Sequence, residues 1–117
     1  MSLINTIIYQ TSTGKEPFTQ WFLELEPTTR SIISTRLKRI SLRNFGDCKI
    51  LKQASSIWEL RIDYGPGYRI YFGKEEHTIV VLLVGGDKKS QTRDILKAQR
   101  YWLDYKGKKN DTKKKKL

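Results

Sequence analysis

The stretch that decides the fold runs from Ile57 to Gly73 and reads IWELRIDYGPGYRIYFG. Its first eight positions alternate between apolar and polar residues, and this two-residue period is typical of a β-strand with one buried face. The triplet GPG at positions 65–67 supplies the chemistry of a tight turn, and a second strand follows from Tyr68 to Gly73. The stretch therefore predicts a β-hairpin.

The pairing of the two strands decides which side chains share a face. Across a short loop we expect Asp63 to lie opposite Arg69 and Arg61 to lie opposite Tyr71. In this register Arg61 and Arg69 project from the same face of the sheet, two rungs apart. A slip of one residue would move Arg69 to the opposite face, because side chains alternate along a strand.

Hydrophobic periodicity predicts the elements on either side of the hairpin. Pro17 suits the first turn of one helix, Pro27 ends that helix, and Thr28 or Thr29 can cap the next. Ser90 can cap the last helix, after the loop GGDKKS. The expected helices cover residues 18–25, 28–44 and 92–105, and the expected strands outside the hairpin cover residues 4–9, 50–53 and 77–84.

The predicted order is β-α-α-β-β-β-α, which is an α+β domain. We expect an N-terminal helical hairpin packed on a mostly antiparallel sheet, followed by a C-terminal helix, over residues 1–105. Residues 106–117, KGKKNDTKKKKL, hold seven lysines and one aspartate without apolar periodicity. Such a composition predicts a disordered, Lys-rich tail, either merely solvated or serving as a tether for polyanions.

The charge of the chain favours a phosphate-bearing partner. The formal net charge is +11, and the tail accounts for +6 of it, so residues 1–105 keep +5. A basic folded domain with 11% aromatic residues suits binding to a nucleic acid.

Other features of the composition point to a cytoplasmic protein. The single cysteine, Cys48, cannot form an internal disulfide, which fits a reducing compartment. The N-terminus shows no basic region of a signal peptide. The longest apolar run, at positions 78–86, is too short to span a bilayer, so we expect no membrane partner.

Three motifs, taken in order and spacing, resemble a known family. They are WELR at 58–61, GPGYRIYF at 65–72, and GGDKKSQ at 85–91 followed by DI at 94–95. Over Ile4 to Tyr105 the chain resembles the RelE/ParE toxin superfamily, and most closely its branch of phage-derived or putative addiction-module killer proteins, which is related to the HigB toxins. The resemblance implies a bacterial type II toxin neutralised by a helix-turn-helix antitoxin. For RNA-cutting members it also implies metal-independent cleavage of mRNA in the ribosomal A site.

Arg61 and Arg69 are the expected catalytic pair. RNA can be cut by its own 2′-hydroxyl attacking the adjacent phosphate, and a protein assists by placing cations around the phosphorus. Arginine suits this task because its planar fork grips two phosphate oxygens and stays charged. The alternative is that each arginine forms a salt bridge with Glu59 or Asp63 on a solvated face.

Further candidates lie near this pair. Lys88, at the end of a buried strand, is expected to contact phosphate or exchange a proton, and Lys89 is expected to bind substrate; both can equally be ordinary loop lysines. Tyr71 could stack on a base or polarise the attacking group. Tyr101 and Tyr105 are weaker candidates, with side-chain packing as the alternative.

We expect no cofactor and no metal. The sole histidine, His77, has no partner for a paired-histidine site, and no Cys/His cluster has the spacing of a zinc site. Cys48 is expected to fill space beside a strand rather than to act as a nucleophile. Trp21 and Trp58 are expected in the core.

The sequence leaves three functions open. The first is a ribosome-dependent mRNA endoribonuclease that inhibits translation. The second is a non-enzymatic toxin that inhibits gyrase, as the ParE branch does, and the third is a basic RNA-binding domain without toxicity. We expect the antitoxin to cover the cationic face or the helical hairpin, with an affinity that falls as salt rises.

Overall fold

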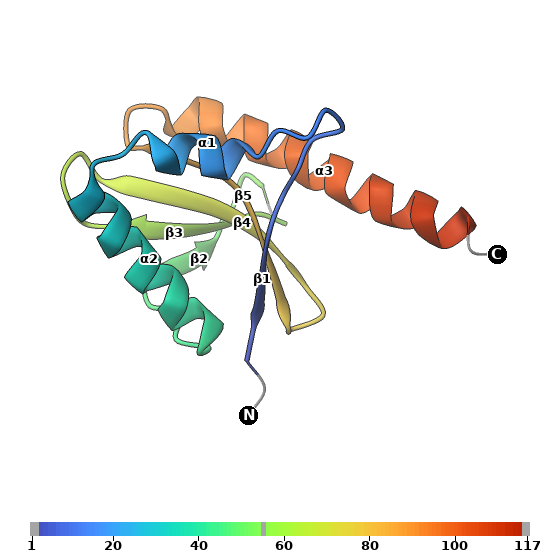
Figure 1. Ribbon diagram of the computed structural model, residues 1–117, viewed down its shortest axis with the longest axis horizontal. Coiled ribbons are helices and arrows are strands. Elements are labelled where there is room, and N and C mark those ends of the chain that lie inside the picture. Colours follow the sequence, from blue (N-terminus) through green and yellow to red (C-terminus); the bar gives the residue numbers. More distant parts are fainter. Residues whose placement is uncertain (1–2, 55, 116–117) are drawn as a thin grey trace.

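The computed structural model describes residues 3–54 and 56–115, with side chains as far as Lys109. The α+β class is confirmed (Figure 1). Four strands follow the helical pair, one for each of the four predicted segments, whereas the predicted order β-α-α-β-β-β-α counted only three of them. The elements are β1 (Asn5–Ile8), α1 (Pro17–Leu23), α2 (Pro27–Ser41), β2 (Cys48–Ile50), β3 (Trp58–Ile62), β4 (Tyr68–Glu75), β5 (Ile79–Asp87) and α3 (Gln91–Lys115).

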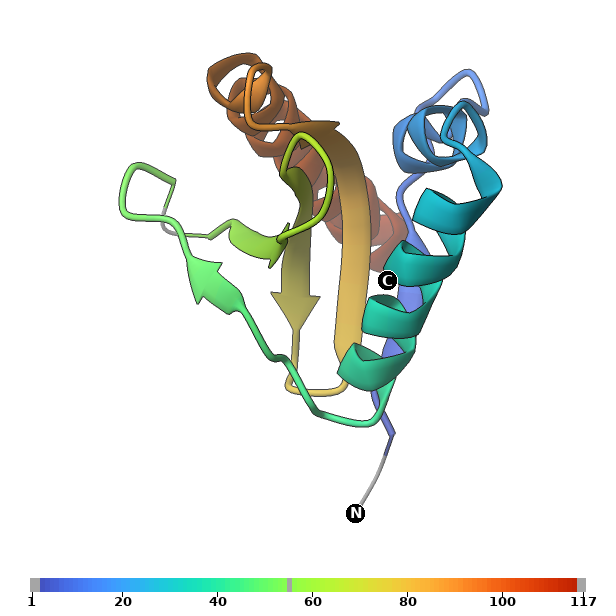
Figure 2. The same ribbon diagram turned by 90° about the vertical axis from the view of Figure 1, so that its left-hand side faces the viewer.

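The strands form one five-stranded sheet in the order β1-β5-β4-β3-β2. Only the pairing of β1 with β5 is parallel, and the other three pairings are antiparallel, as predicted. Helices α1 and α2 cover one face of the sheet and α3 lies against the other (Figure 2). None of the helices within the described residues is long and apolar enough to cross a membrane.

Each face of the sheet carries its own hydrophobic core. Side chains at alternate positions of a strand point to opposite faces, so β3, β4 and β5 contribute to both cores. Burial of each large apolar side chain stabilises the fold by roughly 1.5–3 kcal/mol. The core under the helical pair includes Phe18, Ile33, Ile40, Leu60, Ile70, Phe72 and Val80, and the core under α3 includes Tyr71, Val81, Leu83, Ile95, Ala98 and Trp102.

Proline begins both helices of the N-terminal pair. Pro17 is the first residue of α1, as predicted. Pro27 is likewise the first residue of α2, so the expectation that Thr28 or Thr29 caps this helix is wrong. The fixed φ of proline suits the first helical position, and its missing N–H costs nothing there because that group has no partner within the helix.

The β3–β4 hairpin has a register different from the predicted one. Arg61 pairs directly with Arg69, and Glu59, not Arg61, lies opposite Tyr71. The predicted register was therefore wrong by two residues. Because a shift of two keeps every side chain on its face, Arg61 and Arg69 still share one face, as predicted.

The loop of the hairpin explains the shift. Residues 63–67 all lie outside the strands, so the loop is longer than the GPG triplet alone. The amide of Tyr64 donates to the carbonyl of Ile62, and the amide of Gly67 donates to the carbonyl of Tyr64. Gly65 and Gly67 have φ values of 56° and 80°, which glycine adopts without the strain that a β-carbon would bring.

Two strands lie elsewhere than the sequence suggested. Strand β2 covers Cys48–Ile50 rather than residues 50–53. Strand β5 includes Gly85, Gly86 and Asp87, which we expected in a loop. A β-bulge between Tyr71 and Phe72 of β4 adjusts the pairing just before these glycines.

Helix α3 runs to Lys115, so the expected end at Tyr105 is wrong, and residues 106–115 are helical rather than a disordered tail. The Lys109 Nζ lies 2.9 Å from a carboxylate oxygen of Glu75 on β4. The Lys108 Nζ lies 3.1 Å from Asp104 one turn back. From composition alone we expected these lysines to be solvated. In the structure Lys109 pairs with Glu75 of the sheet and Lys108 pairs with Asp104 of the same helix.

Candidate functional site

A buried carboxylate organises the face of β3 and β4 that lies beside the start of α3. Glu59 has a fully buried side chain. Its Oε1 accepts a hydrogen bond from the Arg61 Nε at 3.0 Å, and its Oε2 accepts one from the Gln91 Nε2 of α3 at 2.9 Å. The Arg69 Nε lies 3.7 Å from the same Oε2. We call Glu59, Arg61 and Arg69 the arginine centre.

The arginine centre keeps an excess positive charge. Two guanidinium groups project from directly paired positions and share one carboxylate, so its formal charge is +1. Like charges on directly opposite residues destabilise a sheet, and Glu59 offsets that repulsion. The carboxylate pairing considered as an alternative is thus present at Glu59, whereas Asp63 is exposed and forms no ion pair within the described residues.

The two arginines differ in their access to a ligand. The Arg61 side chain is 40% exposed, whereas that of Arg69 is 11% exposed. The buried Arg69 Nε has no hydrogen-bond partner among the described residues. Arg61 is therefore accessible to a phosphate that arrives from solvent. Arg69 contributes its positive charge from a mostly buried position.

Tyr71 lies within the core rather than at the surface. Its side chain is fully buried, so it cannot stack on a base, and that predicted role is wrong for this conformation. Burial first, and then the nearby Glu59 carboxylate, raise the pKa of the Tyr71 phenol far above its ordinary value. Its hydroxyl therefore stays protonated, and it has no hydrogen-bond partner among the residues that the structure describes.

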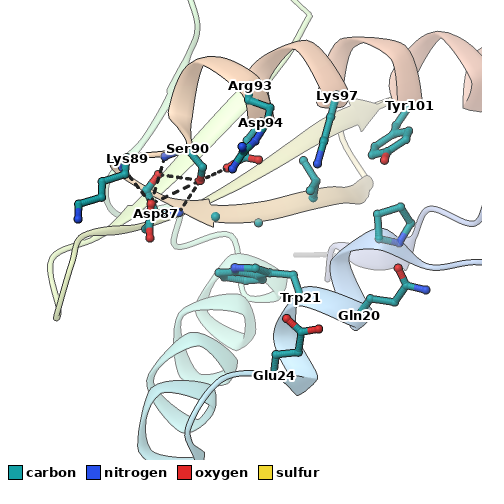
Figure 3. A pocket seen from close by; sticks show the side chains of 14 residues that line it. Gln20, Trp21, Glu24, Asp87, Lys89, Ser90, Arg93, Asp94, Lys97 and Tyr101 are labelled. Carbon is teal, nitrogen blue, oxygen red and sulfur yellow. Dashed lines mark hydrogen bonds between the residues drawn. The ribbon is translucent and has the colours of Figure 1, made fainter.

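A pocket of about 550 Å³ opens next to the arginine centre, between α1, the end of β5 and the start of α3 (Figure 3). We call it the α1–α3 pocket. Lys89 lines it, as expected of a residue that binds substrate. Lys88 is exposed and does not line it; the Lys88 β-carbon lies beside Gly67 in the hairpin loop instead.

Two successive glycines form the floor of the α1–α3 pocket. A β-carbon on Gly85 would lie 2.2–2.3 Å from ring atoms of Trp21, and one on Gly86 would overlap the Asp94 carboxylate. The bare backbone therefore lets α1 approach one face of β5 and α3 approach the other. Trp21, which we expected in the core, is partly buried there and also forms a wall of the pocket.

A hydrogen-bond network fixes the turn between β5 and α3. The Asp87 Oδ1 accepts from the backbone amides of Lys89 and Ser90, at 2.9 and 3.1 Å. Ser90 directly precedes α3, as predicted for its cap, and its hydroxyl donates to the buried Asp94 carboxylate. These bonds hold the first turn of α3 against the sheet.

Basic side chains follow one wall of the α1–α3 pocket. Arg93 and Lys97 are four residues apart on α3, a spacing that places their side chains on one side of the helix, and Lys89 precedes the helix in the same lining. None of their side chains forms an ion pair within the described residues. The facing wall, on α1, carries Gln20 and Glu24 (Figure 3).

The structure thus brings three of the five predicted site residues together and separates the other two. Arg61, Arg69 and Tyr71 are neighbours on one face of β3 and β4. Lys89 lines the pocket at the start of α3, whereas Lys88 does not line it and has its β-carbon beside Gly67. Sequence reasoning missed three side chains as functional candidates. The four-residue spacing of Arg93 and Lys97 on α3 was the available signal for those two residues. The alternation along β3, which places Glu59 on the same face as Arg61, was the signal for Glu59.

The remaining candidates have structural roles. Tyr101 stacks on Tyr9 with ring centroids 5.0 Å apart, and the Tyr105 hydroxyl donates to Glu75 at 2.8 Å, in line with the packing alternative. Burial raises the pKa of the Cys48 thiol to about 11, which leaves little thiolate to act as a nucleophile. His77 is exposed in the turn between β4 and β5.

Comparison with known proteins identifies related sequences. The model of a family described as phage derived protein Gp49-like (DUF891) matches residues 20–101. An uncharacterised protein of Haemophilus influenzae is 41% identical over 83 residues, which cover 70% of this chain and 82% of the relative. The family match spans the arginine centre and, except for Pro17, the lining of the α1–α3 pocket.

Proposed function

The chain belongs to the family of phage derived Gp49-like proteins, and from this premise we propose that it is the toxin of a bacterial addiction module. In this proposal it acts in the cytoplasm as a ribosome-dependent endoribonuclease of the RelE/ParE kind, and a helix-turn-helix antitoxin neutralises it. The motifs WELR and GPGYR, which carry the resemblance to these toxins, contain Arg61 and Arg69.

The observation that carries the proposal is the direct pairing of Arg61 with Arg69 around Glu59. Placing two like charges opposite one another costs stability, and well-packed apolar residues often stabilise such a site at least as well as ions do. A fold that keeps this arrangement, with one guanidinium open to solvent, is suited to hold an anion. A phosphodiester is the anion that a basic domain of this kind meets most often.

The chemistry assigned to the arginine centre is electrostatic. The 2′-hydroxyl of the ribose loses its proton to water as its oxygen attacks the adjacent phosphorus, the bond to the 5′-oxygen of the next nucleotide breaks, and water returns a proton to that leaving oxygen. Arg61 grips the phosphate oxygens, and the charge of Arg69 stabilises the negative charge that develops on them. Glu59 is a positioning residue, since it holds Arg61 but does not face solvent.

Neither the arginine centre nor the neighbouring Tyr71 offers a free base, because Glu59 is engaged by both arginines and Tyr71 keeps its proton. Cations without such a base make a slow nuclease on free RNA. The proposal therefore assigns the alignment of the 2′-hydroxyl to the ribosome, which can supply the orientation that the protein lacks.

A translation extract tests this function. Added wild-type protein is expected to cut mRNA within translated codons and to leave untranslated RNA intact. Arg61→Ala is expected to cut at least a hundredfold more slowly, because loss of one positioned cation removes transition-state stabilisation. Arg100→Ala, which removes an exposed arginine on α3 outside both sites, is the matched control and is expected to keep wild-type cleavage.

Two outcomes would overturn the nuclease proposal. Intact mRNA together with loss of supercoiling in a gyrase assay would indicate an inhibitor of the ParE kind. Intact mRNA together with normal growth of cells that express the protein would indicate an RNA-binding domain without toxicity.

A further inference from the structure

We propose that the α1–α3 pocket binds one nucleotide of an RNA strand, with its phosphate on α3 and the edge of its base on α1. This inference rests on the proposed action on RNA and adds to it a binding site separate from the arginine centre. It stands on three features of the pocket: a basic wall, a hydrogen-bonding wall and an open strand edge.

The basic wall is unpartnered and regularly spaced. Arg93 and Lys97 lie about 6 Å apart along the axis of α3, because each residue of a helix rises about 1.5 Å. Lys89, in the turn directly before the helix, adds a third cation to the same lining. None of the three forms an ion pair in the described part of the chain. The neighbouring carboxylates of Asp87 and Asp94 accept hydrogen bonds from backbone amides and from Ser90 instead, so the three cations are available to a ligand. Such a row suits the phosphates of a single strand.

The opposite wall can distinguish bases. Gln20 of α1 and Glu24, which directly follows that helix, line the pocket beside Trp21 (Figure 3). An amide both donates and accepts hydrogen bonds, whereas a carboxylate only accepts them, so the two groups can read the edge of a base. Cations on one wall and hydrogen-bonding groups on the other suit a nucleotide, which offers both a phosphate and the polar edge of a base.

The floor of the pocket is an uncovered strand edge. Strand β1 ends at Ile8, opposite Leu82, so β5 has no neighbour on that side from Val84 onwards within the described residues. Val84, Gly85 and Gly86 line the pocket. Backbone groups on an unpaired edge can bond to a base or a ribose.

The pocket is close enough to the arginine centre for both to hold one strand of RNA. Gly86, in its floor, pairs with Arg69 on the neighbouring strand. Adjacent strands lie about 4.8 Å apart. Gln91, at the start of α3, bonds to Glu59 of the arginine centre, while Ser90 and Asp94 line the pocket. The first turn of α3 is therefore shared by the two sites.

Binding of a short RNA that cannot be cleaved tests the inference. We suggest a fluorescent hexanucleotide with 2′-methoxy groups, titrated against the full chain at several salt concentrations. The double variant Arg93→Gln/Lys97→Gln is expected to bind about tenfold more weakly. The slope of log affinity against log salt is expected to fall by about 0.7 for each phosphate that the variant no longer binds.

The matched control is Arg100→Gln/Lys52→Gln, which removes the same charge from exposed positions outside the pocket. It is expected to change the affinity less than twofold. Equal weakening of the two double variants would overturn the inference, because it would reveal only a general attraction of charge. Effective competition by a polyglutamate peptide of matched charge would also overturn it, by showing that any acidic chain can occupy the pocket.

Glu24→Gln tests the wall that reads the base. This change is expected to alter the order of affinities for hexamers of different base composition without changing the salt dependence, since Glu24 contacts no phosphate in the proposal. An unchanged order of affinities would contradict the proposal that the α1 wall contacts the base. Because the RNA cannot be cut, these results are independent of cleavage, and the nuclease proposal stands or falls separately on Arg61→Ala.

Discussion

The carboxylate of Glu59 holds two guanidinium groups that would otherwise repel each other across β3 and β4. Its burial makes the arrangement vulnerable, because a buried charge that loses its partner is costly. Arg69 depends on Glu59 most, since its side chain is only 11% exposed. Arg61 can be hydrated when it is released.

Glu59→Gln is therefore expected to lower the free energy of unfolding by roughly 3 kcal/mol, since the charge of Arg69 would remain without compensation. Chemical denaturation measures this change. Asp63→Asn is the control, because Asp63 is an exposed acid that forms no ion pair in the described part of the chain, and it is expected to have an effect below about 0.5 kcal/mol. Equal effects of the two changes would contradict the central role of Glu59.

Two glycines give a prediction with opposite signs. Gly85→Ala is expected to destabilise the protein by about 1–3 kcal/mol, because the new β-carbon meets the ring of Trp21. Gly107→Ala meets nothing within 4 Å and lies in α3, so it is expected to stabilise by about 0.5–1 kcal/mol. Thermal unfolding of both variants measures these changes in stability. A Gly85→Ala variant as stable as wild type would mean that Trp21 does not pack on β5.

The sequence predicted part of this residue-level picture. Alternation along the two hairpin strands placed Arg61 and Arg69 on one face, and this result holds despite the register error because a shift of two residues keeps every side chain on its face. The sequence could not show that Glu59, rather than Arg61, lies opposite Tyr71, because the pairing across a hairpin depends on the length of its loop. The approach of Trp21 to Gly85 depends on contacts between distant segments, which no local pattern reports.

A hydrogen bond joins helix α3 to Tyr9, the residue that directly follows β1. The buried Tyr9 hydroxyl donates to the Asp104 carboxylate at 2.5 Å. This bond, and then the contact with Lys108, hold the pKa of Asp104 below its ordinary value of 3.8. Because the folded pKa is depressed, the contribution to stability is present above the ordinary pKa and is lost as the pH falls through the folded one.

Tyr9→Phe is expected to cost about 1 kcal/mol at neutral pH. The difference from wild type should shrink once the pH is well below 3.8, where Asp104 is protonated in both proteins. Urea unfolding at a series of pH values measures this difference. A difference that does not change with pH would show that the ring, rather than the bond to Asp104, accounts for the loss.

Elements were predicted more accurately than their boundaries. Apolar spacing identified the helices and the strands of the sheet. It misjudged the start of α2 because Pro27 can either end one helix or begin the next. It placed Gly85 and Gly86 in a loop because glycine pairs are common in turns, whereas here close packing on both faces requires them within β5.

At the scale of the whole molecule, the sheet is covered on both faces and α3 continues past it (Figure 1). Lys108 and Lys109 connect that continuation to the body, through the carbonyl of Gln10 and the carboxylate of Glu75. A chain that ends at Tyr105 lacks both lysines and their bonds, and a chain that ends at Lys109 keeps them. The first is expected to melt roughly 3 °C below the second, as measured by circular dichroism. Equal melting temperatures would indicate that these bonds contribute nothing to stability.

The central claim is that a guanidinium at position 61 holds the phosphate that is cut. Its most direct test is the rate of mRNA cleavage on purified ribosomes carrying a defined codon in the A site, for wild type, Arg61→Lys and Arg61→Gln. Lysine keeps the charge but loses the fork that grips two oxygens, so we predict an intermediate rate for Arg61→Lys and almost no cleavage for Arg61→Gln. Wild-type cleavage by Arg61→Gln, with the variant folded, would contradict the account.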